Sequence, residues 1–197
     1  MKKWWGLLAL AAVCFAGVFA VPYGNFWVKI TLTVLLLTGL SGVKPKRPVV
    51  NLTEIVIGIL GAVVLYGIFW FGNYLSAQVF SFAPEQVDSI YAIKQQRNKT
   101  LIAAVLMLIT SPGEEIFWRG YIQQTAMTRW GRIPGILAGI ATYAGVHVAS
   151  GNFMLVGAAF TAGVFWCLLY SWRRNLTACV ISHCLWTVGV FLVFPIR

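Results

Sequence analysis

Apolar runs of about 20 residues recur along the whole chain, and this pattern limits the fold more than any other feature of the sequence. A run of this length crosses the hydrocarbon of a bilayer as one helix. Transmembrane strands would instead alternate apolar and polar side chains, and these runs do not alternate. The sequence therefore predicts an all-α, polytopic transmembrane helical bundle without a sheet.

We expect about seven spans, separated by short stretches rich in Pro, Gly and basic residues. The first span has a second interpretation as a signal peptide, because a basic start precedes an apolar run that ends in small residues. The polar stretch 81–100 is predicted to be either an interfacial amphipathic helix or a solvated loop. The predicted spans are 4–21, 26–43, 52–75, 101–126, 134–150, 153–172 and 175–195.

The chain carries a formal net charge of +10, although only 10% of its residues are charged. Lys and Arg fall mainly in short loops, as the positive-inside rule describes, and no basic stripe with interleaved aromatic residues indicates nucleic acid as a partner. With seven spans, nine basic residues share the side of the N-terminus and four lie opposite, which predicts a cytoplasmic N-terminus. The nine are Lys2, Lys3, Lys44, Lys46, Arg47, Arg129, Arg132, Arg173 and Arg174, and the four are Lys94, Arg97, Lys99 and Arg197.

All four cysteines lie inside apolar runs and none forms a C-x-x-C pair, so neither structural disulfides nor a cysteine-based zinc site is predicted. Cys179 and His183 share a helix face at i, i+4, which offers a thiol–imidazole pair as one alternative. A buried cysteine is more often a small packing residue.

The segment "SPGEEIFWRG" (111–120) holds two of the five acidic residues of the chain, Glu114 and Glu115. Ionisable side chains inside a membrane are costly and usually mark a pathway or a reaction centre. Glu115 and Arg119 share one helix face with Gln123, so Arg119 is predicted to pair with Glu115, while Glu114 is turned about 100° away. The S-x-x-E pattern at 111–114 also predicts a helix start in mid-membrane, and a purely structural role for Glu114 as its capping residue is an alternative.

The only two histidines, His147 and His183, also fall inside predicted spans. Measured from the cytoplasmic span ends, Glu115 lies at a depth of about 18 Å, His147 at about 20 Å and His183 at about 12 Å. Three separate helices are therefore expected to bring carboxylates and imidazoles to one polar pocket.

These residue types suit hydrolysis. A carboxylate held away from bulk water is a better base near neutral pH, an imidazole can orient the attacking water, and a second imidazole can donate to the developing oxyanion. A zinc-dependent version of the reaction stays an alternative, because two His and one Glu also form a catalytic zinc set with an open position for water. Its ligands would be Glu114, His147 and His183.

Three motifs stand in order, each on its own predicted span: "EEIFWR" (114–119), "YAGVH" (143–147) and "HCLWT" (183–187). They resemble the E-E-x-x-x-R, F-x-x-x-H and H-x-x-x-N motifs of the CPBP family of intramembrane proteases, which includes the CAAX prenyl endopeptidases and many bacterial proteins. Tyr143 replaces Phe in the second motif and Thr187 replaces Asn in the third. We expect one membrane domain over 1–197, with N-terminal spans in 1–80 and a CPBP-like catalytic core in 101–195.

The resemblance implies that Glu114 activates water with help from His147, that Glu115 and Arg119 complete the site, and that His183 stabilises the oxyanion. Tyr143 and Thr187 would support the site, and the departure at Thr187 puts the oxyanion role of that position in doubt, because a hydroxyl is a weaker donor than an amide.

The metal-free, glutamic-type reaction is favoured over zinc. The implied protein is an endopeptidase of a prokaryotic inner membrane that contacts lipid and cleaves a membrane-anchored protein or peptide. The alternatives from other classes are a non-catalytic scaffold or immunity protein and a small transporter.

Overall fold

The computed structural model describes residues 1–43 and 50–196, and within them the chain is all-helical with no strand. This confirms the predicted fold class. Lys44, Lys46, Arg47 and Arg197, which contribute to the predicted orientation, lie outside the described residues.

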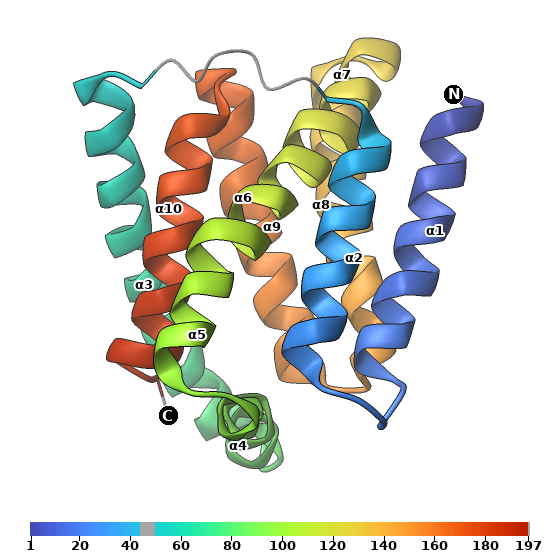
Figure 1. Ribbon diagram of the computed structural model, residues 1–197. Helices are drawn as coiled ribbons and strands as arrows, with labels where there is room; N and C mark the ends of the chain where they lie inside the picture. Colours follow the sequence, from blue (N-terminus) through green and yellow to red (C-terminus); the bar gives the residue numbers. More distant parts are fainter. Residues whose placement is uncertain (44–49, 197) are drawn as a thin grey trace.

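The helices follow one another through short connections and pack side by side, with the N-terminal α1 next to α2 and α8 (Figure 1). The helix that carries the acidic pair consists of alternating α and π segments and runs through the middle of the bundle. The elements are α1 (Lys2–Phe19), α2 (Phe26–Ser41), α3 (Leu52–Val79), α4 (Ala83–Ala92), η1 (Ile93–Gln96), α5 (Lys99–Val105), η2 (Leu106–Thr110), α6 (Ser111–Glu114), η3 (Glu115–Gln123), α7 (Gln124–Trp130), α8 (Arg132–His147), η4 (Val148–Ser150), α9 (Phe153–Arg173), α10 (Leu176–Val188) and η5 (Gly189–Val193).

Six helices among the described residues are long and apolar enough to cross a membrane, which is typical of an integral membrane protein. The second expected span forms a shorter apolar helix, α2, of 16 residues. At 1.5 Å per residue this helix is about 24 Å long, less than the hydrocarbon thickness of about 30 Å. It ends early because Gly42 adopts a left-handed conformation with φ of 67°.

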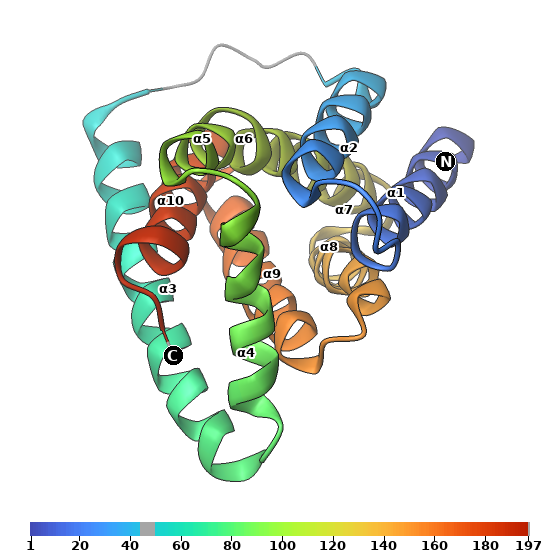
Figure 2. The ribbon, with the colours of Figure 1, turned by 60° about the horizontal axis from the view of Figure 1, so that its bottom comes forward.

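The polar stretch that follows α3 forms a helix, which decides between the two interpretations of residues 81–100. The buried side chains of α4 are Ala83, Val87 and Tyr91, spaced i, i+4, i+8, so α4 is amphipathic. In Figure 1 it is seen end-on below the other helices, and the turned view of Figure 2 shows it running between α3 and α9. The Asn152 side chain donates to the Gln86 carbonyl over 2.9 Å and fixes α4 to the start of α9.

The helix from Lys99 to Trp130 is continuous over 32 residues, so the prediction of a helix start at Ser111 is wrong. Pro112 cannot donate a backbone hydrogen bond, and the helix absorbs this with a π segment before α6 and another after it. Such widened turns re-aim side chains and are frequent at functional sites. The acidic pair sits at the junction of α6 and η3.

Gly113 lets α2 approach this junction closely. A Cβ at Gly113 would collide with the Val34 side chain, and the Thr38 hydroxyl donates to the Gly113 carbonyl over 3.0 Å. The absence of a side chain at Gly113 therefore sets the distance between α2 and the helix that carries Glu114.

Replacing Gly113 by Leu is expected to lower the free energy of unfolding by about 1–3 kcal/mol, because the new side chain overpacks the α2–α6 contact. Gly67→Leu is the matched control, since no atom lies within 4 Å of a Cβ built at Gly67. The measurement is thermal unfolding of both variants in detergent. Equal stability of the two variants would contradict close packing at Gly113.

Candidate active site

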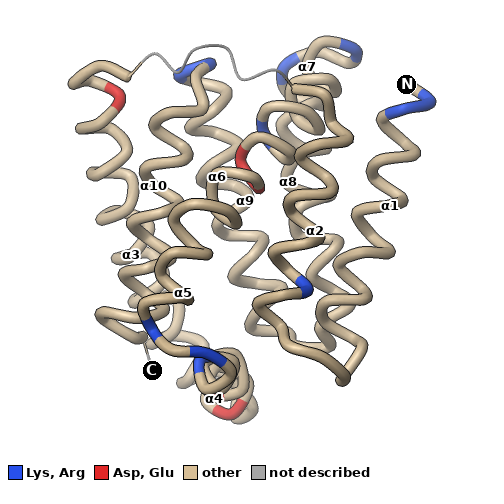
Figure 3. The backbone as a smooth tube through the Cα atoms, in the orientation of Figure 1, with Lys and Arg blue, Asp and Glu red and all other residues tan. Residues whose placement is uncertain are grey.

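Charged residues of the described chain gather mainly at the two ends of the bundle, whereas an acidic group lies in its interior at α6 (Figure 3). Three elements bring the predicted residues to this interior position: the α6–η3 junction, the end of α8, and α10. The arrangement agrees with the expectation that three separate helices contribute to one polar cluster.

Glu115 is the centre of a buried ionic group. Its Oε1 lies 3.1 Å from an Arg119 guanidinium nitrogen and 2.8 Å from His183 Nδ1. The contact with Arg119 confirms the predicted pairing of the two residues, and neither side chain has exposed surface. Because a carboxylate only accepts hydrogen bonds, His183 Nδ1 carries a proton and donates a hydrogen bond to Glu115, which leaves Nε2 outside that contact.

Aromatic rings enclose this ionic group. The Arg119 guanidinium carbon lies 4.5 Å from the centre of the Tyr143 ring and 5.3 Å from that of Trp166. Trp166 also stacks on the His183 ring, with the ring centres 3.8 Å apart. These contacts fix the plane of the His183 imidazole and stabilise the cation by cation–π attraction.

Glu114 has a different environment from its neighbour. Its Oε2 accepts a hydrogen bond from the Tyr143 hydroxyl over 3.1 Å, and its Oε1 has no hydrogen bond from any described residue. The Ser111 hydroxyl is buried without a partner, so the predicted capping box does not form and Glu114 is not its capping residue. One carboxylate oxygen of Glu114 is therefore free for a water or a substrate.

His147 is the last residue of α8 and is buried against α1. Its Nδ1 lies 2.8 Å from the Tyr143 carbonyl, and since a carbonyl only accepts, Nδ1 carries the proton and Nε2 has the lone pair. Its ring lies 5.1 Å from the Tyr143 ring and packs on Phe15 and Phe19. His147 does not bond Glu114 directly, and Tyr143 links the two residues.

Thr187 lies one helical turn beyond His183. Its hydroxyl is buried and has no hydrogen-bond partner, so it does not bond to a carbonyl of its own helix.

The residues of the zinc alternative do not fit one metal ion as they are arranged. Among the described residues, no three His, Cys, Asp or Glu side chains are placed to hold a metal together. His183 Nδ1 faces Glu115 and His147 Nδ1 faces a carbonyl, so only the Nε2 atoms of the two rings could serve as ligands. The alternative thiol–imidazole pair is also not formed, because the Cys179 thiol contacts the Trp166 carbonyl at 3.8 Å.

Trp166 is the site residue that the sequence did not predict. Its ring stacks on His183, and its indole N–H donates to the Ser182 hydroxyl over 3.2 Å. In an apolar span, a tryptophan that supports a site has the same sequence pattern as one that packs against lipid or core, so no sequence signal separates the two.

A family model described as "Type II CAAX prenyl endopeptidase Rce1-like" matches residues 96–189, a range that contains all seven predicted site residues. No curated protein and no solved structure matches the chain. Residues 96–189 are therefore a domain of the Rce1-like type II CAAX prenyl endopeptidase family, a family of proteases.

Proposed function

We propose that the chain is an intramembrane endopeptidase, which hydrolyses a peptide bond in or near the membrane of a membrane-anchored protein or peptide. Glu114 activates the water, and no metal takes part in the steps below. The observation that carries the proposal is the unequal environment of the acidic pair. Arg119 and His183 both bind the Glu115 carboxylate, whereas Glu114 keeps one carboxylate oxygen without a partner.

Each side chain has a role that its hydrogen bonds support. Glu114 takes a proton from water, and the oxygen of that water attacks the peptide carbonyl carbon. His147, protonated on Nδ1, presents the lone pair of Nε2 to the same water. His183 keeps its Nδ1–H on Glu115 and, when its ring carries both protons, donates from Nε2 to the oxyanion. Collapse of the tetrahedral intermediate breaks the C–N bond, and the leaving amine takes the proton that Glu114 holds.

Tyr143→Phe is expected to keep the fold and to change the rate of hydrolysis by less than about tenfold, because the loss is one hydrogen bond to Glu114. The ring is retained, and with it the contacts to Arg119 and His147. Tyr143→Ala removes the ring and is expected to lower the rate by more than about a hundredfold. The measurement compares the two rates in vesicles, and equal losses would contradict a supporting role for the ring.

We further propose that 101–195 is the catalytic core and that the N-terminus is cytoplasmic. The ends of α7 and α9 and the start of α1 share one face of the bundle with many of the basic residues, which supports this orientation (Figure 3). The basic residues near α4 lie at the opposite face.

The proposal is tested by comparing the proteins and peptides of membranes that contain the wild type, Glu114→Gln or Glu85→Gln. Glu85 is exposed on α4, so the control carries the same chemical change away from the site. We expect cleaved products in the wild type and in Glu85→Gln, and uncleaved precursors in Glu114→Gln. The same set of proteins and peptides in all three membranes would favour a non-catalytic scaffold over a protease.

A further inference from the structure

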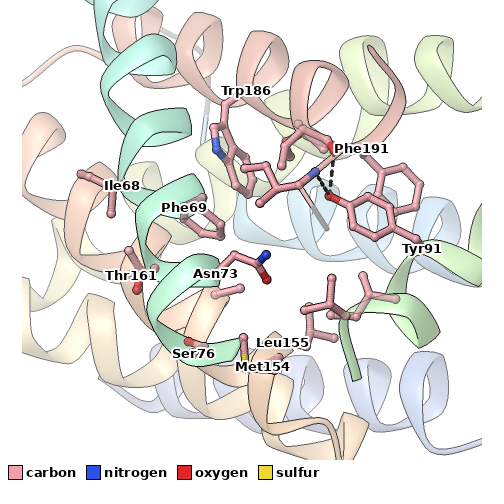
Figure 4. Close-up of a pocket in the computed structure, with 18 of the residues that line it drawn as sticks. Ile68, Phe69, Asn73, Ser76, Tyr91, Met154, Leu155, Thr161, Trp186 and Phe191 are labelled. Atoms are coloured by element: carbon pink, nitrogen blue, oxygen red, sulfur yellow. Dashed lines mark hydrogen bonds between the residues drawn. The ribbon is translucent and has the colours of Figure 1, made fainter. Parts of the chain in front are cut away.

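A cavity of about 410 Å³ lies between α3, α4, α9 and α10, separate from the catalytic carboxylate. Its wall is mostly apolar, with Phe69, Leu155 and Phe191 among its members (Figure 4). Neither Glu114 nor either histidine lines it. Two residues of its wall, Trp186 and Thr187, follow His183 by about one turn of α10.

Several polar groups of the cavity wall have no partner in the protein. The Thr187 hydroxyl and the Trp186 indole N–H are buried without a hydrogen bond. The amide of Asn73 makes no hydrogen bond to a described residue, and Figure 4 shows it extending from α3 into the cavity. Unpaired donors and acceptors are costly where no bulk water reaches, and of these groups the Asn73 amide faces the cavity, so a ligand that offers both kinds of partner would pair with it.

The shape and chemistry of the cavity select the ligand. One turn of a helix with its side chains occupies about 400–600 Å³, so the cavity is too small for a spanning helix. A lipid ester offers acceptors only, whereas an extended peptide backbone offers donors and acceptors along its length. Asn73 can satisfy both, and the apolar wall suits apolar side chains.

We propose that this cavity binds an extended, apolar segment of the peptide substrate, with the Asn73 amide hydrogen-bonding its backbone. The inference rests on the proposed peptidase function and adds where the substrate lies. An unwound segment held along α10 places the next peptide bond beside His183. The proteolytic specificity would then come from the side chains that this cavity accepts.

The test measures binding alone, in protein that cannot turn over. Glu114→Gln protein in phosphatidylcholine vesicles is illuminated with the peptide acetyl-Leu-Ala-photoleucine-Ala-Leu-amide, and the labelled residues are identified by mass spectrometry. A parallel sample contains phosphatidylcholine with a photoreactive acyl chain. We expect the peptide to label residues of the cavity wall, and the acyl chain to label mainly exposed outer faces.

Two variants on α3 test whether a bulky side chain inside the cavity blocks peptide binding. Gly72 lines the cavity and Gly67 does not, and neither has an atom within 4 Å of an added Cβ. In the Glu114→Gln background, Gly72→Leu is expected to reduce peptide labelling of the wall by about tenfold or more, and Gly67→Leu to leave it unchanged. Asn73→Leu keeps the size of the side chain and is expected to weaken peptide binding by about threefold to tenfold.

Three results would overturn the proposal: labelling of the wall that persists in Gly72→Leu, labelling of the wall by the acyl chain but not by the peptide, or no labelling of the wall at all. Because the assay uses an inactive variant, such results leave the hydrolytic role of Glu114 standing. Conversely, loss of that role leaves the binding result intact, so the two failures are distinguishable.

Discussion

Replacement of Glu114 by Gln is expected to lower the rate of peptide hydrolysis by about a hundredfold to ten-thousandfold, with the fold retained. The amide has nearly the same size as the carboxylate and can still accept the hydrogen bond from Tyr143. It cannot take a proton from water, so the activation step is lost. Rates are measured on purified protein in vesicles, with the substrate that the membrane comparison identifies.

Glu85→Gln is the control for this loss, because it removes one carboxylate from an exposed position. A retained unfolding temperature in Glu114→Gln excludes misfolding as the cause. Hydrolysis at the wild-type rate by Glu114→Gln would show that another group activates the water.

Removal of the Arg119 guanidinium is expected to have the largest effect on stability. Arg119→Met leaves Glu115 as a fully buried carboxylate with His183 as its only partner, and breaking a buried pair in this way costs about 3–5 kcal/mol. We expect a large fall in the unfolding temperature and loss of hydrolysis, measured by thermal unfolding in detergent and by the vesicle assay.

The double variant Glu115→Gln, Arg119→Met separates charge from packing. It removes both charges, so we expect it to recover at least about half of the lost stability, but not the activity, because His183 loses its carboxylate partner. Arg129→Met, at an exposed position on α7, is the control and is expected to change stability by less than about 0.5 kcal/mol. An Arg119→Met protein as stable as the wild type would contradict the importance of the buried pair.

The sequence predicted those features that depend on composition and on local spacing. The apolar runs predicted the helical bundle, and the i, i+4 spacing of Glu115 and Arg119 predicted their ion pair. The three motifs predicted the family, which the match to residues 96–189 supports.

Features that depend on contacts between distant segments were not predictable. The spacing of residues along one helix does not reveal contacts between helices. His183 bonds Glu115 across 68 positions, and the Tyr143 hydroxyl bonds Glu114 across 29 positions. The capping box at Ser111 was predicted from a local pattern. It does not form, because the helix continues through Ser111 with a π segment on either side of α6. The predicted span 26–43 corresponds to α2, which ends two residues earlier, at Ser41, because Gly42 adopts a left-handed conformation.

Transfer of oxygen from water is the most direct test of water activation by Glu114. Hydrolysis in H₂¹⁸O over many turnovers is followed by mass spectrometry of the product and of the enzyme peptide that contains Glu114. We expect one ¹⁸O atom at the new carboxyl terminus of the product and none in Glu114. Label in the Glu114 carboxylate would contradict this mechanism, because it would mean that the side chain itself attacks the substrate and forms a covalent anhydride.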